Sequence, residues 1–155
     1  MTENKIIETA KRVIETEIKA VKNLINNINK DFVATVEAIY NSTGRVVFTG
    51  MGKSGLIARK IVATLNSTGT PSIFLHPTDA LHGDLGMVRK EDIVILVSKS
   101  GNTEELADLV SMLKRMNVII IGMVGNPDSK IGKASSFILK VNVEEEACPF
   151  DLAPT

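Results

Sequence analysis

A loop at residues 98–103 holds residue types that suit the binding of a phosphate group. It reads Ser-Lys-Ser-Gly-Asn-Thr and leads directly into a segment of helical periodicity. Backbone N–H groups at a helix N-terminus form an anion site together with the helix dipole, and the hydroxyls of Ser98, Ser100 and Thr103 add neutral donors. The alternative is ordinary N-capping of the helix by Asn102 or Thr103. We favour a phosphate site because a cap needs one such residue, whereas this loop places several hydroxyls around a glycine.

A glycine-rich loop at residues 50–55 is the second candidate binding loop and reads Gly-Met-Gly-Lys-Ser-Gly. It is not a Walker A motif, because that spacing requires a glycine where this chain has Val47. It does match the Gly-x-Gly-x-x-Gly spacing of dinucleotide-binding proteins. However, His76 and a proline stand where the acidic residue is expected, and Lys53 stands where bare backbone must approach the cofactor. A glycine turn that lets a strand and a helix pack closely explains the spacing better than a dinucleotide site.

Hydrophobic periodicity indicates the elements that position these loops. Apolar residues at helical spacing, with Lys and Glu between them, predict one long amphipathic helix over residues 6–28 and a shorter one over 32–39. The Asn-Ser-Thr-Gly stretch at 41–44 ends this helical part. Short apolar runs then alternate with helical stretches. The predicted strands are 46–48, 72–76, 93–97, 118–122 and 137–143, and the predicted helices between them are 56–65, 104–116 and 128–134.

Near-continuous apolar strands that alternate with helices predict an α/β fold with a parallel sheet covered on both faces. We expect a flavodoxin-like, doubly wound, five-stranded parallel sheet in the order 2-1-3-4-5, preceded by the N-terminal helices. Strands one and three are neighbours in that order, so the loops at 50–55 and 98–103 border one crevice. No helix follows the last strand. Either the chain is truncated, or the N-terminal helices and a partner subunit cover that face.

Composition and charge exclude several functional classes. The length of 155 residues fits one domain, and 18 Lys plus Arg balance 18 Asp plus Glu. The chain therefore lacks the basic excess of proteins that bind nucleic acid or anionic membranes. No apolar run approaches the roughly 18 residues of a membrane span, and the N-terminus does not read as a signal peptide. Because the single cysteine, Cys148, cannot form an intrachain disulfide, we expect a soluble protein of the cytoplasm.

Four motifs occur in a fixed order along the chain and together identify a family. They are GMGKSG at 50–55, HPTDALHGDLG at 76–86, SKSGNTEE at 98–105 and EACP at 146–149. In combination they strongly resemble the sugar isomerase (SIS) domain, and in particular the bacterial arabinose-5-phosphate isomerases. The resemblance implies a single SIS domain over residues 1–155, with N-terminal helices at 1–43 and an α/β core at 44–155. Longer members of the family append CBS domains, and the family's chain continues past this C-terminus into a helix that carries a further catalytic histidine.

The resemblance implies an aldose–ketose isomerase that interconverts ribulose 5-phosphate and arabinose 5-phosphate through a cis-enediol, for synthesis of the lipopolysaccharide sugar Kdo. It also implies a homo-oligomer with sites shared between subunits. Two alternatives stay open. One is a non-catalytic regulator module that binds a sugar phosphate, and the other is an SIS isomerase for another sugar phosphate.

The resemblance also assigns roles to individual residues. Lys53, Glu105 and Glu146 match the family's catalytically important lysine and two glutamates. The positions that match substrate contacts are Ser54, Gly69, Thr70, His76, His82, Ser98, Ser100, Gly101, Asn102 and Thr103. His76 also matches a position able to take a zinc ion, although one protein nitrogen makes a poor zinc site. The implied reaction requires no cofactor.

The chemistry of isomerisation accounts for these residue types. The reaction moves a proton from the carbon beside a carbonyl to the neighbouring carbon, so it needs a carboxylate base and a cation or acid where negative charge develops. Glu146 or Glu105 is the candidate base, and Lys53 either stabilises the enediolate or holds the phosphate. Structural explanations stand beside these roles. Acids such as Glu105 are favourable near a helix N-terminus, and the glutamate run at 144–146 is of a kind that is normally solvated.

Overall fold

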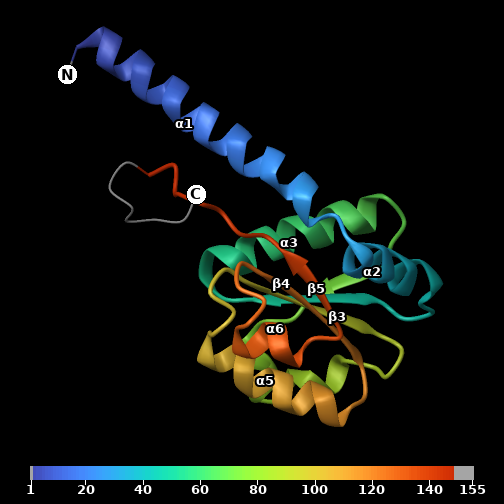
Figure 1. Cartoon of the computed structure of the whole chain (residues 1–155). Coiled ribbons are helices and arrows are strands. Elements are labelled where there is room, and N and C mark those ends of the chain that lie inside the picture. The colour runs from blue at the N-terminus through green and yellow to red at the C-terminus, as the bar shows by residue number, and fades with distance from the viewer. Residues whose placement is uncertain (1, 149–155) are drawn as a thin grey trace.

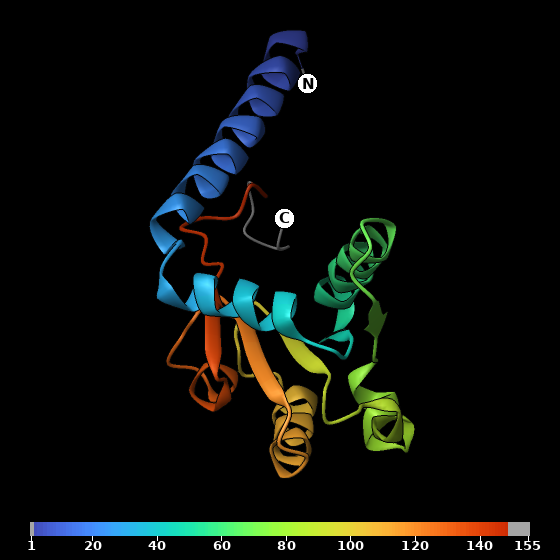
Figure 2. The same cartoon turned by 90° about the vertical axis from the view of Figure 1, so that its right-hand side faces the viewer.

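A computed structural model of the chain describes residues 2–148 and shows an α/β fold. A five-stranded sheet lies between two layers of helices, and a long N-terminal helix extends away from this body (Figures 1 and 2). In chain order the helices, 3-10 helices (η) and strands are α1 (Glu3–Asn23), η1 (Leu24–Asn27), α2 (Lys30–Asn41), β1 (Val46–Gly50), α3 (Gly52–Ser67), β2 (Ser72–Phe74), α4 (Pro77–Leu81), η2 (Asp84–Met87), β3 (Ile93–Ser98), α5 (Glu104–Arg115), β4 (Ile119–Val124), α6 (Lys130–Ala134) and β5 (Phe137–Lys140).

The strands of the sheet are parallel and follow the order β2-β1-β3-β4-β5. This order confirms the flavodoxin-like arrangement that the sequence predicts. β1 and β3 are neighbours, in a register that runs from Val46 opposite Ile93 to Gly50 opposite Val97. The loops that follow these two strands therefore leave the sheet side by side at its carboxyl edge, the edge where the parallel strands end.

The hydrophobic core lies on both faces of the sheet, because alternate residues of each strand point to opposite sides. On one face, Val47, Val94 and Leu96 pack against α4, α5 and α6. On the other face, Val46 and Ile95 pack against α2 and α3. Figure 2 shows helices on both sides of the sheet. Strands buried on both faces are apolar almost throughout, and this is why they stand out in the sequence as continuous apolar runs.

The N-terminal helical part is divided where the sequence predicts one helix over residues 6–28. α1 ends at Asn23, and η1 separates it from α2. Asn29 caps α2, since its Oδ1 accepts hydrogen bonds from the N–H groups of Asp31 (2.9 Å) and Phe32 (3.3 Å). Asparagine side chains compete with a helix for backbone hydrogen bonds. The asparagine-rich stretch before α2 therefore breaks the helix although the apolar spacing continues.

Two strands are shorter than the sequence predicts, and two short helical turns are not predicted at all. β2 ends at Phe74 because Pro77 opens α4, and a proline cannot donate to a sheet. β5 ends at Lys140, and the chain beyond it runs without regular structure up to residue 148. α4 has five residues and η2 has four, which is too short for hydrophobic periodicity to show them.

α2 covers the last strand, for which the sequence offers no following helix. Ala38 of α2 packs in the same cluster as Phe137 of β5. The carboxylate of Asp31 accepts a hydrogen bond from the N–H of Ile138 (3.1 Å). An N-terminal helix therefore covers part of the face beside the last strand.

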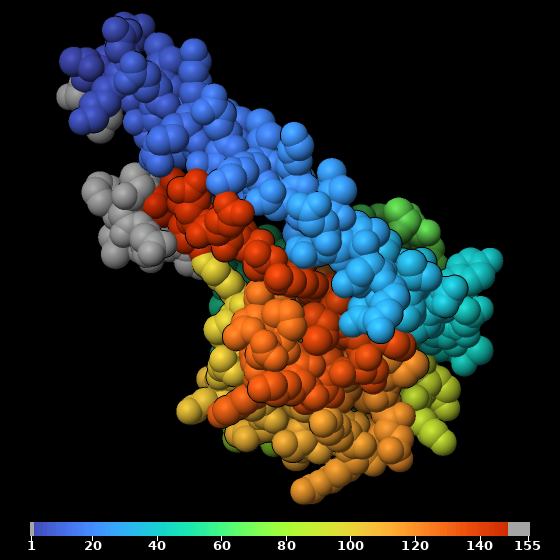
Figure 3. Space-filling model, viewed as in Figure 1, coloured from blue at the N-terminus to red at the C-terminus, as the bar shows by residue number. Residues whose placement is uncertain are grey.

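α1 leaves the body of the molecule with its apolar side exposed. No residue of α1 is buried. Ile14, Ile18 and Val21 of α1 and Ile25 of η1, which follows directly, are here called the apolar stripe of α1 and are 55%, 59%, 66% and 69% exposed. Figure 3 shows α1 standing out from the body, with the segment after β5 lying along its base. None of the helices within residues 2–148 is long and apolar enough to cross a lipid bilayer.

Candidate active site

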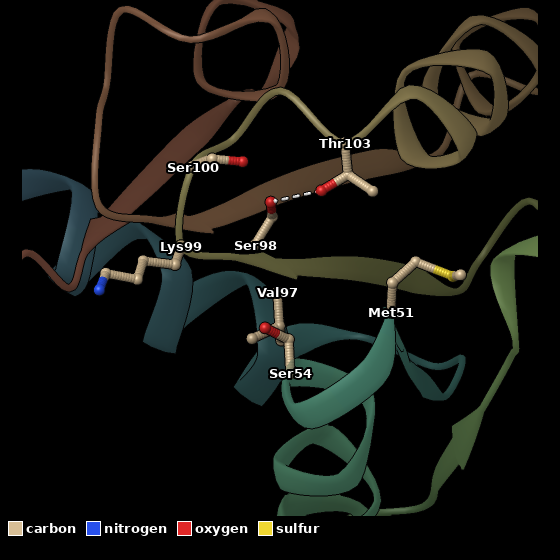
Figure 4. A pocket seen from close by; sticks show the side chains of 7 residues that line it. All are labelled: Met51, Ser54, Val97, Ser98, Lys99, Ser100 and Thr103. Atoms are coloured by element: carbon tan, nitrogen blue, oxygen red, sulfur yellow. Dashed lines mark hydrogen bonds between the residues drawn. The ribbon is translucent and has the colours of Figure 1, made fainter. Parts of the chain in front are cut away.

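The loop after β3 brings hydroxyl side chains to the N-terminus of α5. Ser98 is buried at the end of β3, and its Oγ accepts a hydrogen bond from the N–H of Gly101 (3.1 Å) and shares another with Thr103 Oγ1 (3.1 Å; Figure 4). Thr103 occupies the N-cap position of α5, yet its side chain makes no capping hydrogen bond. Asn102 Oδ1 accepts instead from the N–H of Lys130 (3.0 Å). Ordinary capping by these two side chains, the alternative to a phosphate site, is therefore wrong.

The same loop is held against the loop that follows β4. The N–H of Ile131 donates to the carbonyl of Gly101 (3.0 Å), and the N–H of Gly125 donates to the carbonyl of Lys99 (3.0 Å). Gly101 has φ +68°, and a Cβ at this position would collide with the side chain of Ser129. Only glycine fits this turn without strain. The backbone of residues 98–103 is thus positioned by hydrogen bonds and close packing before any ligand binds.

A cavity of about 420 Å³ lies between this loop and the start of α3. Figure 4 shows the hydroxyls of Ser98 and Thr103 on one side and Ser54 of α3 on the other. The residues that line it are Met51, Ser54, Val97, Ser98, Lys99, Ser100 and Thr103. The N-termini of α3 and α5 thus meet at one cavity at the carboxyl edge, where the sequence predicts a crevice. Two helix dipoles favour an anion at this point.

Close packing accounts for the glycines of the loop after β1. A Cβ on Gly55 would lie 2.6 Å from the carbonyl oxygen of Gly50, and Gly52 has φ +53°. The N–H of Gly55 donates to the carbonyl of Met51 (3.2 Å), which starts α3 directly at the end of the strand. The geometry supports the glycine-turn interpretation of this spacing over the dinucleotide one.

A second cavity, of about 530 Å³, adjoins the first and shares Ser54, Val97 and Lys99 with it. Lys53 and Glu146, two of the three predicted catalytic residues, both line this second cavity. Glu146 forms an ion pair with Lys99, and its side chain is only 8% exposed. The remaining lining residues are apolar: Leu56, Ile57, Met123, Val141 and Val143. Charges surrounded by apolar walls interact more strongly than charges in open water.

Among the predicted site residues that line neither cavity of their own chain are Glu105, Gly69 and Thr70. Glu105 is exposed on the first turn of α5 and lines neither cavity. Gly69 and Thr70 lie in the turn between α3 and β2, where the N–H of Thr70 donates to the carbonyl of Leu65 (2.9 Å). α3 carries the chain from the carboxyl edge of β1 to the opposite edge of the sheet, so this turn is remote from the phosphate loop. Within a single chain these residues lie apart from the two cavities, and their roles in the site stay a prediction.

The two histidines lie around α4, beside the carboxyl end of β2. His76 occupies the N-cap position of α4, and its ring packs edge-on against Phe74 with 6.4 Å between centroids. Its Nδ1 is buried and makes no hydrogen bond to the described residues. His82 is exposed at the C-terminus of α4. Residues 2–148 contain no group of three His, Cys, Asp or Glu side chains that fits a metal ion. One nitrogen makes a poor zinc site, and zinc at His76 stays a prediction.

An ion pair at the opposite edge of the sheet joins the amino ends of β1 and β3. The Asp92 carboxylate accepts hydrogen bonds from the Arg45 guanidinium (2.7 and 3.3 Å) and from the N–H groups of Arg45 (2.8 Å) and Arg89 (2.9 Å). Burial raises the pKa of Asp92, but the hydrogen bonds from Arg45 and Arg89 outweigh it and hold the pKa below its usual range. This pair lies away from both cavities and acts on stability rather than on chemistry.

Lys99 is a site residue that sequence reasoning missed. It lies between the predicted residues Ser98 and Ser100, lines both cavities and pairs with Glu146. Alternation along an extended chain was the available signal, because it places Lys99 on the opposite side from its two serine neighbours. The pairing with Glu146 leaves no local pattern in the sequence.

Comparison with known proteins identifies the family. A sequence profile of the SIS domain matches residues 38–155. The chain belongs to the SIS domain family. Arabinose 5-phosphate isomerase KdsD of Pseudomonas aeruginosa is 48% identical to it over 149 residues, which is 96% of this chain and 46% of that protein. The SIS chain thus spans about half the length of the curated relatives it matches.

Solved structures agree with this SIS domain over its whole length. An Escherichia coli CFT073 protein in complex with arabinose 5-phosphate has a TM-score of 0.94 at 40% identity, covering 100% of this chain and 82% of that one. A putative sugar-phosphate isomerase from Listeria monocytogenes has a TM-score of 0.93 at 38% identity, covering 98% and 80%. The five-stranded parallel sheet and its helices are therefore those of the SIS fold.

Proposed function

We propose that this SIS domain is the catalytic part of an aldose–ketose isomerase that interconverts ribulose 5-phosphate and arabinose 5-phosphate. The observation that carries the proposal is that two cavities adjoin each other. One has hydroxyls at two helix N-termini, and the other is lined by Lys53 and Glu146. The names of the curated relatives and the arabinose 5-phosphate bound to the E. coli protein support this choice of substrate. A role in supplying the lipopolysaccharide sugar Kdo is part of the proposal and rests on the family resemblance.

The two cavities divide the work of an isomerase between them. The substrate phosphate binds at the N-terminus of α5, where Ser100 and Thr103 and the helix dipole favour it. The sugar carbons extend into the second cavity, where Glu146 takes a proton from the carbon next to the carbonyl. Lys53 stabilises the negative charge that develops on oxygen in the cis-enediolate. A proton passes from the hydroxyl oxygen to the former carbonyl oxygen, and the proton held by Glu146 returns to the neighbouring carbon. No redox change occurs overall, since one proton and one electron pair shift between adjacent carbons.

We further propose a homo-oligomer in which copies of the chain complete the site. The apolar stripe of α1 is exposed, and large exposed apolar surfaces mark interaction sites. Glu105, Gly69 and Thr70 lie outside the two cavities of their own chain. If they contact substrate, a second copy must supply them, and isologous packing of two copies does so reciprocally.

Incubation of the protein with ribulose 5-phosphate in D2O tests the proposed reaction. We expect arabinose 5-phosphate with deuterium at C2, and recovered ribulose 5-phosphate with deuterium at C1, because an enediol intermediate exchanges its proton with solvent. NMR spectroscopy identifies the product and the labelled position. Binding of the pentose phosphate without turnover or deuterium uptake contradicts the proposal and favours a non-catalytic regulator module. Deuterium uptake into another sugar phosphate, and not into the pentose phosphate, favours an SIS isomerase with another substrate.

A further inference from the structure

The side chain of Lys99 points away from the hydroxyls that flank it in the sequence. Figure 4 shows its amino group on the far side of the chain from Ser98, Ser100 and Thr103. Alternation at the end of β3 explains this, because Val97 and Lys99 face the α2–α3 side of the sheet while Ser98 faces the other. The ammonium therefore lies beside the second cavity and not at the N-terminus of α5, where we place the phosphate.

The ammonium of Lys99 pairs there with the carboxylate of Glu146, whose side chain is 8% exposed. A carboxylate removed from water to this degree loses stability in its charged form unless a cation or hydrogen bonds compensate. The Lys99 side chain is 54% exposed and so keeps much of its own hydration. The ion pair therefore stabilises the charged form of Glu146 more than it stabilises the charged form of Lys99.

Glu146 lies in a segment that has no helix or strand to fix it. Side-chain and backbone contacts hold this segment at intervals. The ammonium of Lys19 on α1 lies 2.7 Å from a carboxylate oxygen of Glu144, and the N–H of Val141 donates to the carbonyl of Val124 (2.9 Å). The contact with Lys99 connects the segment to the loop after β3.

The backbone of Lys99 is a firm anchor for this contact. Its carbonyl accepts from the N–H of Gly125 (3.0 Å), and a Cβ on Gly125 would come within 2.7 Å of that oxygen. The two backbone segments, at Lys99 and at Gly125, are therefore packed as closely as glycine permits. A lysine on such a support defines a place for its partner, whereas a lysine on a mobile loop does not.

The other charged groups near Glu146 come from two elements. Lys53 projects from α3 and lines the same cavity. Glu145 is exposed next to it in the chain, and Glu144 is engaged by Lys19. Lys53 and Lys99 thus face Glu146 from different elements, which allows one to act on the substrate while the other acts on the carboxylate.

We propose that Lys99 is a positioning residue that holds the Glu146 carboxylate, in its charged form, at the wall of the second cavity. The inference rests on the proposed function in so far as Glu146 is the base of the isomerisation. It adds a division of labour between the two lysines. Lys53 faces the substrate, and Lys99 keeps the base in place and ready to accept a proton.

Titration of Glu146 tests the inference without any need for turnover. In protein labelled with 13C at the glutamate carboxyl carbons, the signal of Glu146 is assigned by its loss in Glu146→Gln. We expect Lys99→Met to raise the pH midpoint of this signal by at least about one unit, because loss of a neighbouring cation destabilises the carboxylate. Lys99→Arg restores a midpoint near that of the wild type. An unchanged midpoint in Lys99→Met overturns the inference.

Lys114→Met is the matched control, because Lys114 is exposed in the last turn of α5, at the opposite edge of the sheet. It removes the same charge and leaves the Glu146 midpoint unchanged if the inference is right. An equal shift in this control overturns it, since the effect is then one of net charge.

If Lys99→Met does not fold, titration of the wild type decides. The 13Cε signal of Lys99 moves through the Glu146 midpoint and loses this inflection in Glu146→Gln, and the absence of an inflection overturns the inference.

Two further measurements separate this inference from the proposed function. We expect Lys99→Met to leave the affinity for inorganic phosphate within about twofold. A loss as large as that in Ser100→Ala, with the Glu146 midpoint unchanged, shows a phosphate ligand and overturns the inference. In the active protein, Lys99→Met lowers kcat about tenfold or more with little change in KM. A wild type that never turns over pentose phosphate contradicts the proposed function, whereas the Glu146 midpoints still decide the role of Lys99.

Discussion

Ser98 and Ser100 carry the same hydroxyl but differ in what surrounds it. Ser98 is buried, and its Oγ is engaged by Gly101 and Thr103 within the loop. Ser100 is exposed at the first cavity, and its Oγ accepts a hydrogen bond from the N–H of Asn102 (3.2 Å). An accepting hydroxyl keeps its own proton to donate. Ser98 therefore shapes the loop, and Ser100 is placed to donate to a phosphate oxygen.

Substitution of the two serines separates these roles. We expect Ser98→Ala to lower the free energy of unfolding by about 1–2 kcal/mol, because it leaves the N–H of Gly101 without its buried acceptor. Ser100→Ala changes stability by less than about 0.5 kcal/mol but weakens binding of a pentose phosphate roughly 5–30-fold. Urea unfolding and calorimetric titration measure the two effects. Ser111→Ala, on the exposed side of α5, is the control, and equal behaviour of the variants at 98 and 100 contradicts the assignment.

Glu146 and Glu105 are predicted to differ, because only Glu146 lines the cavity with Lys53. We expect Glu146→Gln to lower turnover about 10²–10⁴-fold while pentose phosphate binding survives, since the variant keeps the shape and loses the basic carboxylate. Glu105→Gln has a comparable effect only in an oligomer that brings Glu105 of one copy to the cavity of another. Steady-state kinetics of both variants in the active protein provide the measurement. Full turnover in Glu146→Gln shows that another group is the base.

At the scale of elements, the sequence predicts the helices whose apolar residues recur at helical spacing and the strands whose apolar residues form a continuous run. The runs around Val47, Val94 and Ile120 predict the three central strands because both of their faces are buried. The same reasoning misses α4, which is five residues long and begins at a proline. It also extends the first helix through a run of asparagines, since apolar spacing carries no information on side chains that compete for backbone hydrogen bonds.

For the site, the sequence predicts which loops meet but not which side chains meet. Parallel strand order brings the loops after β1 and β3 together, and Ser54 and Ser98 accordingly line one cavity. The pairing of Lys99 with Glu146 joins residues far apart in the chain, and no local pattern signals it. Family resemblance adds Gly69 and Thr70, although α3 places them at the other edge of the sheet.

The Arg45–Asp92 pair ties β1 to β3 and gives an element-scale prediction. We expect Asp92→Asn to lower the free energy of unfolding by about 1–3 kcal/mol at neutral pH, because part-buried hydrogen bonds from Arg45 and Arg89 lose their charged acceptor. The folded-state pKa of Asp92 is depressed, so its contribution is present above the unfolded-state pKa of about 3.9 and is lost as the pH falls through the folded value. The difference between wild type and variant therefore shrinks below about pH 4.

Urea unfolding at neutral pH and at about pH 3 measures this difference. Glu91→Gln serves as the control, because Glu91 is the exposed neighbour of Asp92 and loses the same charge. A stability gap for Asp92→Asn that persists undiminished in acid contradicts the role of the ionised pair.

At the scale of the whole molecule, the exposed α1 is the feature that the body of the fold does not explain. The apolar stripe faces solvent in a single chain, while the polar side of α1 holds the segment after β5 through Lys19 and Glu144. A helix with this pattern gains most of its stability by packing its apolar side on another surface. The proposed oligomer supplies that surface.

Sedimentation of the chain tests the oligomer. At micromolar concentration we expect a species larger than 16.8 kDa. Ile18→Asp weakens the association at least about tenfold, because an unpaired carboxylate in an apolar interface is costly. Thr9→Asp, about two and a half helical turns away and on the opposite side of α1, is the control and leaves the association unchanged. A wild type that sediments only as the monomer contradicts the oligomer.

The hydrogen bond from Ile138 to Asp31 limits how copies of this chain can join. An edge strand with open backbone groups is a template on which another chain's strand can add, and sheets grow into fibrils in this way. At one edge, α2 lies against β5 and takes up the N–H of Ile138, and at the other edge β2 offers only three residues. Strand addition is therefore disfavoured at both ends of the sheet. In the oligomer we propose, copies join through helices, and isologous packing of that kind closes into an assembly of fixed size where strand addition would continue without limit.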